Sequence, residues 1–314
     1  MNFTNAIKRE ILNKQLKDEH CKKAFIAGLI RGTGELYEKD GELGIDVRTN
    51  NEETAMLVSS LMRTLFDYEV REMSVTEDKL NKKDKFVLSI SGEKTIEILK
   101  GLEIIFEREE TFDVNLNLYG KITQKECCLK SFIRGLFVAT GSCMLPSTAD
   151  KSNTGYHLEI MFSHKTPAYQ TSEQLSKYNV ETKVTKRRDN YIVYIKSAED
   201  IKDFLAFLPA PISVLKITDL MINRELVNNS NRRKNCDLGN VNKQVEASSK
   251  QISAINKIEK VIGLESLKED LYATAIARRD NAEETLVELA ERLGVSKSCL
   301  NHRLRKLVQI ASQL

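Results

Sequence analysis

The chain has 314 residues, of which 41% are hydrophobic and 30% charged, and its formal net charge is +3. This length is enough for two or three modest domains, and the composition is that of an ordinary folded protein. No apolar run approaches the roughly 20 residues needed to cross a bilayer, and the first residues do not resemble a signal peptide. We therefore expect a cytoplasmic protein with no membrane contact.

The charge is distributed unevenly along the chain. Residues 1–222 carry 32 basic and 33 acidic side chains, whereas residues 223–314 carry 16 basic and 12 acidic ones. The segment from Gly294 to Leu314 contains Lys297, Arg303, Arg305 and Lys306 but no acidic residue. This asymmetry favours contact with a polyanion at the C-terminal end, with a merely solvated tail as the alternative.

The six cysteines, at positions 21, 127, 128, 143, 236 and 299, form no C-x-x-C pair. His20 precedes Cys21, but no further cysteine or histidine ligand lies near them in sequence. The pattern therefore predicts free thiols in a reducing compartment, with no disulfide, metal site or cofactor.

A similar phrase occurs twice in the chain, after a first helix that we expect to be capped by Thr4 and to extend to about Leu16. Residues 25–34 read FIAGLIRGTG, and residues 132–141 read FIRGLFVATG. Each phrase predicts a helix with a small residue in mid-face, Gly28 or Gly135, and a glycine suited to a helix stop. Small residues allow close approach of two helix backbones, so we expect a pseudo-two-fold pair.

The segments after each phrase have the same predicted order of strand, helix, strand, strand and helix. In the first copy these elements are 43–49, 52–66, 69–76, 85–91 and 93–102; in the second they are 156–163, 167–178, 180–186, 191–196 and 198–208. Residues 142–155 are expected to form a polar loop. Turns between antiparallel strands are predicted at 81–84 and 187–190.

The C-terminal region is predicted to be entirely helical. A polar, asparagine-rich segment within 223–244 indicates a linker, and helices are expected at 245–262 and 265–279. Thr285 is then expected to cap a helix, Gly294 to provide a left-handed turn, and Ser296 to cap a second helix with an inner row of leucines. This spacing is typical of a helix-turn-helix motif.

The outward positions of that second helix are polar or basic, and the first residues of such a helix contact base edges. Asn301 suits adenine, whereas Arg305 and Lys297 suit guanine or phosphate. Arg303 lies where an inward apolar residue is common, and we expect it to lean outward to a phosphate. An ordinary helical hairpin with a solvated face is the alternative. The predicted DNA-binding residues are Ser296, Lys297, Ser298, Asn301, His302, Arg303, Arg305 and Lys306.

Residues 26–34 and 133–141 resemble the LAGLIDADG motif of homing endonucleases. The resemblance implies two αββαββα halves whose motif helices form the interface, with two saddle-shaped antiparallel sheets on DNA. In that family the last aspartate of each motif, just before the final glycine, binds a catalytic divalent metal.

The acidic positions of the motif are missing from this sequence. Thr33 and Thr140 occupy the metal-binding positions, and Arg31 and Val138 occupy the earlier acidic ones. A hydroxyl is a poor substitute for a carboxylate on a hard cation. Glu35 follows the first copy, but the second has no acid at the matching place. We therefore predict a protein that is not an enzyme and has no catalytic residues; a metal-dependent endonuclease is the weakest alternative.

The degenerate motif, the segment 231–237 and the helix-turn-helix phrase 296–306 together resemble the WhiA proteins. This resemblance implies a bacterial DNA-binding transcriptional regulator, linked to cell division and chromosome segregation and, in some filamentous relatives, to sporulation. It also implies double-stranded DNA as the partner and association with the nucleoid.

The predicted architecture is α+β. A LAGLIDADG-like αββαββα duplicate with pseudo-two-fold symmetry occupies residues 1–222 (repeats about 20–105 and 127–210), 223–244 is a linker, and 245–314 is an all-α helix-turn-helix domain. Because residues 1–222 carry no excess of basic residues, an interaction protein is the main alternative. In that alternative the repeat domain binds a sigma factor or a division protein. Weaker candidates for DNA contact are Lys186, Arg187, Arg188, Arg232, Arg233 and Lys234.

Overall fold

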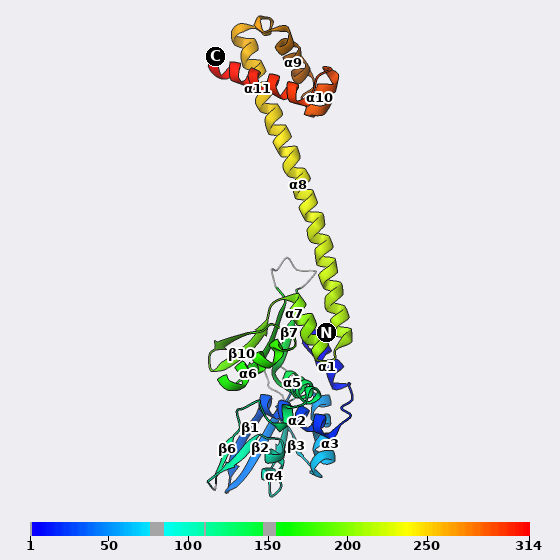
Figure 1. Cartoon of the computed structure of the whole chain (residues 1–314), viewed down its shortest axis with the longest axis vertical. Coiled ribbons are helices and arrows are strands. Elements are labelled where there is room, and N and C mark those ends of the chain that lie inside the picture. The colour runs from blue at the N-terminus through cyan, green and yellow to red at the C-terminus, as the bar shows by residue number, and fades with distance from the viewer. Residues whose placement is uncertain (1, 76–84, 110, 147–154) are drawn as a thin grey trace. The chain divides into compact units, whose positions relative to one another are not determined.

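The computed structural model describes residues 2–75, 85–109, 111–146 and 155–314 (Figure 1). The chain divides into two compact units, Met1–Ile222 and Asn223–Leu314. The first unit contains helices and strands, and the second is helical. No helix among the described residues is long and apolar enough to span a bilayer. The turn predicted at 81–84 lies outside the described residues.

The first unit contains two copies of an αββαββα repeat. The elements of the first copy are α2 (Glu19–Thr33), β1 (Gly34–Lys39), β2 (Glu42–Thr49), α3 (Glu52–Phe66), β3 (Arg71–Val75), β4 (Lys85–Ile90) and α4 (Thr95–Gly101). The elements of the second copy are α5 (Glu126–Thr140), β7 (Gly141–Met144), β8 (His157–Phe162), α6 (Lys165–Ser176), β9 (Lys183–Arg187), β10 (Asn190–Ile195) and α7 (Ala198–Phe207). The short hairpin β5 (Ile105–Arg108) and β6 (Thr111–Val114) and the 3-10 turn η1 (Lys121–Thr123) separate the copies.

Each copy builds one four-stranded antiparallel sheet, and the two sheets have matching strand orders, β1-β2-β4-β3 and β7-β8-β10-β9. The predicted α+β duplicate is therefore confirmed. The strands β1 and β7 were missed by the element-by-element prediction. The charged strand β1 gains its ladder only by pairing with β2, and β7 occupies the start of the segment predicted to be a loop.

The two motif helices, α2 and α5, pack through their glycines. A Cβ atom added to Gly28 would lie 2.0 Å from the carbonyl oxygen of Phe132, and one added to Gly135 would lie 2.0 Å from that of Phe25. The surrounding phenylalanines are almost fully buried. Only glycine allows this backbone-to-backbone approach, so the predicted pair of helices with pseudo-two-fold symmetry is confirmed.

The motif helices end at the predicted glycines, which cap α2 and α5. Gly34 (φ −77°) and Gly141 (φ −74°) are extended, not left-handed. An added Cβ would lie 2.6 Å from the carbonyl oxygen of Ile30 at Gly34, and 2.6 Å from that of Phe137 at Gly141. Glycine is required there because a strand begins in close contact with the last helical turn.

The N-terminal helix α1 (Phe3–Leu12) also differs from the prediction, since Asn2 caps it and it ends before Leu16. The Asn2 side chain accepts a hydrogen bond from the Thr4 amide at 3.2 Å. The Thr4 hydroxyl instead donates to the carbonyl of Cys143 at 2.9 Å and accepts from the Cys143 amide at 2.8 Å. Thr4 therefore ties α1 to the edge strand β7.

The second unit has its own core. It contains most of α8 (Pro211–Ile262), then η2 (Leu264–Ser266), α9 (Glu269–Asp280), α10 (Leu286–Arg292) and α11 (Lys297–Gln313). The segment 223–244, predicted to be a linker, is helical and belongs to α8. No proline follows Pro211, and each added helical residue gains a hydrogen bond once the helix has begun. The core is formed by Ala254, Ile255, Ile258, Leu264, Leu271, Ala275, Leu289, Ala290, Leu300, Leu304, Leu307 and Ala311.

Candidate nucleic-acid interface

The first helix of the predicted motif, α10, begins with a reciprocal cap. The Thr285 amide donates to the Glu288 carboxylate at 2.7 Å, and the Glu288 amide donates to the Thr285 hydroxyl at 3.3 Å. This arrangement satisfies two amides that the helix itself cannot pair. Leu289 and Ala290 on the inner face of α10 are buried.

The turn between α10 and α11 depends on Gly294, whose φ is +64°. Only glycine adopts this conformation without strain. The amide of Val295 closes the turn on the carbonyl of Ala290 at 3.0 Å. Ser296 then caps α11 by accepting a hydrogen bond from the Cys299 amide at 3.2 Å. The predicted helix-turn-helix geometry is therefore present.

The helix α11 has an apolar face and a polar face. Leu300, Leu304 and Leu307 are buried against α9 and α10. Most of the predicted DNA-binding residues lie on the other face of α11. Asn301 is half-buried there. The exposed residues are Ser296, Lys297, Ser298, His302, Arg305 and Lys306.

The basic residues on the polar face of α11 are free. Within the part of the chain that the structure describes, Lys297, Arg305 and Lys306 form no ion pair and no side-chain hydrogen bond. Lys297, Asn301 and Arg305 follow one another at i, i+4 spacing, as do Ser298, His302 and Lys306. Residues at this spacing are neighbours on a helix surface, so the two rows form one continuous polar strip.

Arg303 does not lean outward as expected. Its guanidinium lies 3.6 Å from the carboxylate of Asp270 on α9, and its side chain is only 22% exposed. One side of position 303 faces α9. This contact can hold either an apolar side chain or a cation that is paired with an acidic residue. Arg303 therefore joins α11 to α9 and is the one predicted contact residue that the structure turns away from the polar strip.

The second unit contains a buried arginine that sequence reasoning missed. Arg278, 1% exposed, donates to Gln251 at 2.9 Å and to the carbonyl of Glu284 at 2.7 Å. Burial lowers the pKa of Arg278, and the nearby Glu284 partly opposes that effect. The residue joins α8, α9 and the start of the motif, and no local pattern distinguishes it from the half-buried Arg279 beside it.

The C-terminal ends of the motif helices do not fit a catalytic metal. The hydroxyls of Thr33 and Thr140 donate back to the carbonyls of Leu29 and Leu136, each at 3.3 Å. Glu35 lies 2.9 Å from the guanidinium of Arg48. The site therefore offers one carboxylate, which is already paired, and two hydroxyls that already donate hydrogen bonds. A hard divalent cation requires more negative charge than this.

Arg31, at an acidic position of the motif, is used within the protein. It donates to the carbonyl of Asn117 at 3.0 Å and to that of Glu103 at 2.7 Å. Burial lowers the pKa of Arg31 to about 10. Arg31 is therefore a structural cation that holds the segment between the two copies.

The weaker basic candidates are exposed. Arg187 lies 3.7 Å from Glu159, and the Lys186 ammonium lies 5.9 Å from the ring centroid of Tyr191. Arg188 occupies the β9–β10 turn with φ +54°, as the predicted turn requires. The other three candidates, Arg232, Arg233 and Lys234, are exposed on α8.

Sequence reasoning also missed a group at the opposite ends of the motif helices. The tertiary structure brings His20 and Cys21 together with Cys127 and Cys128. The prediction of no metal site was based on the absence of a further ligand nearby in sequence. The two pairs belong to different repeats and meet only because α2 and α5 cross.

The fold and the C-terminal motif define a protein with a duplicated LAGLIDADG-like domain and a helix-turn-helix domain. Three family descriptions match it in order: the WhiA N-terminal LAGLIDADG-like domain over residues 19–105, the WhiA LAGLIDADG-like domain over 129–227 and the WhiA C-terminal HTH domain over 230–311. The chain therefore belongs to the WhiA family.

Full-length relatives agree with this assignment. The chain is similar to proteins named "Probable cell division protein WhiA" from Bacillus cereus (strain B4264) and Bacillus mycoides (strain KBAB4). Each is 34% identical over 317 residues, with 100% of this chain and 97% of the relative covered. The crystal structure of full-length DUF199/WhiA from Thermatoga maritima has the same fold, with a TM-score of 0.59 and 23% identity, over 100% of this chain and 99% of that one.

Proposed function

We propose that the protein binds double-stranded DNA through α11 and regulates transcription linked to cell division and chromosome segregation. The observation that carries this proposal is the polar strip of α11, on which Lys297, Arg305 and Lys306 have no acidic partner among the described residues. Free cations on an exposed helix face displace counterions from DNA phosphates, whereas paired ones do not.

The geometry of α11 also suits base recognition. In helix-turn-helix proteins the N-terminal part of the second helix enters the major groove. The Ser296 hydroxyl accepts from Cys299 and retains its own hydrogen for a phosphate. Asn301 and Arg305, one turn apart, carry the side chains that suit adenine and guanine. DNA binding through this surface requires no metal and no cleavage.

The test is a double substitution, Asn301→Ala with Arg305→Ala, in the full chain. Genome-wide association of the wild-type protein first identifies its sites, and fluorescence anisotropy then measures affinity for them. We expect a loss of about 1–3 kcal/mol per base contact and the disappearance of discrete association peaks.

A matched control replaces one amide and one cation on α8, away from the polar strip, Asn256→Ala with Lys257→Ala, both of which are exposed. This control should retain the peaks. Unchanged affinity and unchanged peaks in the Asn301/Arg305 variant would rule out α11 as the reading helix. Transcript changes that follow the peaks would support the regulatory role, and plasmid nicking with Mg²⁺ would contradict binding without cleavage.

A second candidate function is the binding of a division or transcription protein by the repeat domain. The β5–β6 hairpin exposes three large apolar side chains, Phe106, Phe112 and Val114, at 47%, 39% and 50%. The strand register places Phe112 and Val114 on one face of the hairpin and Phe106, paired with Asp113, on the other. Exposed apolar groups on a hairpin suit a protein partner more than DNA. A Phe106→Ser, Phe112→Ser variant that keeps its DNA sites but loses a co-purified partner would support this function, and one that keeps the partner would oppose it.

A further inference from the structure

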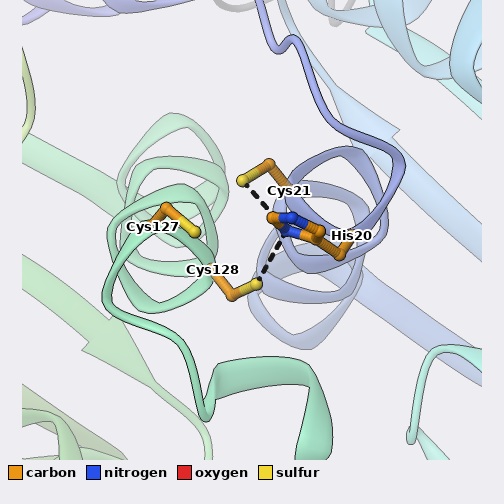
Figure 2. Close-up of side chains that lie close together, drawn as sticks. All are labelled: His20, Cys21, Cys127 and Cys128. Atoms are coloured by element: carbon orange, nitrogen blue, oxygen red, sulfur yellow. Dashed lines mark hydrogen bonds between the residues drawn. The ribbon is translucent and has the colours of Figure 1, made fainter.

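The first turns of α2 and α5 bring together one imidazole and three thiols. Figure 2 shows His20 and Cys21 on one helix facing Cys127 and Cys128 on the other. Their four ligating atoms all lie within 4.8 Å of one another. The His20 Nδ1 atom is 3.3 Å from the Cys21 sulfur and 3.2 Å from the Cys128 sulfur. Cys21 and Cys128 are buried, and Cys127 is exposed.

The cluster follows the internal symmetry of the domain. The sequence offset that relates Gly28 to Gly135 also relates His20 to Cys127 and Cys21 to Cys128. Each repeat therefore contributes an adjacent pair of ligands from the same helical position. The close approach at the two glycines holds the helices at the distance at which these pairs meet.

The donor set selects the kind of ligand. Three sulfurs and one imidazole nitrogen suit a soft or borderline cation, whereas Mg²⁺ and Ca²⁺ prefer oxygen. A tetrahedral zinc ion with bonds of about 2.0–2.3 Å places its ligands roughly 3.5–3.8 Å apart. The two nitrogen–sulfur distances are slightly shorter than this spacing, and all four atoms lie within 4.8 Å of one another. Small side-chain movements would therefore bring the four ligands to coordinating distance.

The surroundings of His20 also suit a bound cation. Its Nδ1 atom faces the sulfurs, and its Nε2 atom lies 3.9 Å from the carboxylate of Asp18. A carboxylate near the second ring nitrogen favours a proton there and leaves the first nitrogen free to coordinate. In addition, both ligand pairs, His20 with Cys21 and Cys127 with Cys128, lie at helix N-termini, where the helix dipole favours negative ligands.

We propose that His20, Cys21, Cys127 and Cys128 bind one Zn²⁺ ion that cross-links the two repeats. Four protein ligands complete a tetrahedral shell and leave no open position, so the site is structural. Binding would release the thiol protons to solvent and stabilise the packed α2–α5 pair. The site lies at the opposite helix ends from Thr33 and Thr140 and is independent of the proposed DNA binding.

The experiment uses the full chain, expressed without a histidine tag and purified anaerobically with reductant. Mass spectrometry of metals should find stoichiometric zinc. Replacement by Co²⁺ should give the intense visible bands and sulfur charge transfer of a tetrahedral thiolate site. Cys21→Ser and Cys128→Ser should each weaken Co²⁺ binding by more than tenfold, roughly as loss of a ligand implies. Cys236→Ser, which alters an exposed thiol outside the cluster, should bind as wild type.

A second variant separates metal binding from folding. Asp18→Asn keeps all four ligands and retains a residue type that favours the start of α2. We expect roughly tenfold weaker zinc affinity with unchanged secondary structure. Stoichiometric zinc in the wild type together with this graded loss would support the site.

Three results would overturn the proposal. The first is a reduced wild-type chain that takes up no stoichiometric zinc or cobalt. The second is an equal loss of metal in Cys236→Ser and Cys128→Ser. The third is a native disulfide between Cys21 and Cys127 or Cys128, found by thiol trapping at lysis in a metal-free chain, which would make the cluster a redox pair.

Discussion

The repeat domain and the C-terminal unit use their basic residues in different ways. In the repeat domain, Arg31 on α2 and Arg134 on α5 donate to main-chain carbonyls, and burial lowers the pKa of each to about 10. In the C-terminal unit, one buried arginine holds the helices together and one half-buried arginine pairs with Asp270. The three cations of the polar strip of α11 have no ion-pair partner among the residues that the structure describes.

The difference shows why charge counting locates a polyanion surface only roughly. The four basic residues after Gly294 suggest such a surface, yet one of them, Arg303, is committed to an internal ion pair. The affinity for DNA depends on the number of cations that are paired with no acidic group of the protein, because these cations can replace counterions at the phosphates. Substitutions that distinguish cations paired within the protein from cations that face solvent therefore test this comparison.

The largest effect is expected where backbones touch in the repeat domain. Gly28→Ala places a Cβ 2.0 Å from the carbonyl oxygen of Phe132, so we expect a loss of about 3 kcal/mol in the free energy of unfolding. In Gly239→Ala, by contrast, the added Cβ meets nothing within 4 Å, and the change should stabilise α8 by about 0.5–1 kcal/mol. Urea denaturation of the full chain measures both, and equal effects would contradict the packing described.

The next effect concerns the internal cation of the C-terminal unit. Arg278→Met would leave the carbonyl of Glu284 and the side-chain amide oxygen of Gln251 without their buried donor, at a cost of about 2 kcal/mol. Arg279→Met, which removes exposed ion pairs to Glu259 and Asp280, should cost less than about 1 kcal/mol. Thermal unfolding followed by circular dichroism compares the two, and a larger loss at Arg279 would reverse the assignment.

A pair of substitutions on α11 tests the comparison directly. Arg305→Ala should lower DNA affinity by about 1–3 kcal/mol and reduce the salt slope of binding by about 1, because a free cation is lost. Arg303→Ala should leave the salt slope unchanged and cost less than about 1 kcal/mol in stability, because its partner is Asp270. Anisotropy at several salt concentrations gives the slopes; a reduced slope for Arg303→Ala would return that residue to the DNA surface.

The smallest effect concerns pH. Burial lowers the pKa of Lys8 on α1 from 10.5 to about 8. Between these values the unfolded chain binds more protons than the folded one, so the Lys8 contribution to stability rises with pH across this window. Lys8→Met should be more stable than wild type near pH 7 by about 1 kcal/mol, and this advantage should shrink toward pH 10.5. Denaturation at both pH values checks this, and a pH-independent difference would contradict it.

Much of the fold could be read from local patterns. The boundaries of α3 (Glu52–Phe66) match the prediction, and the cap residues Thr285 and Ser296 act as expected, because period and capping chemistry involve neighbours in sequence. The strand β1 could not be read in this way, since its charged residues become a strand only by pairing with β2. The helical state of 223–244 was missed because asparagine suggests a linker, although no proline interrupts the helix.

The sequence by itself determined the duplication, the close-packed motif glycines, the missing acids at Thr33 and Thr140, and the helix-turn-helix with its polar strip. Each of these depends on residue type and spacing within one element or on an internal repeat. Only the tertiary structure decided that Arg303 faces Asp270 and that His20 and Cys21 meet Cys127 and Cys128. These contacts join residues far apart in the chain, and the crossing of packed helices, which no local pattern encodes, brings them together.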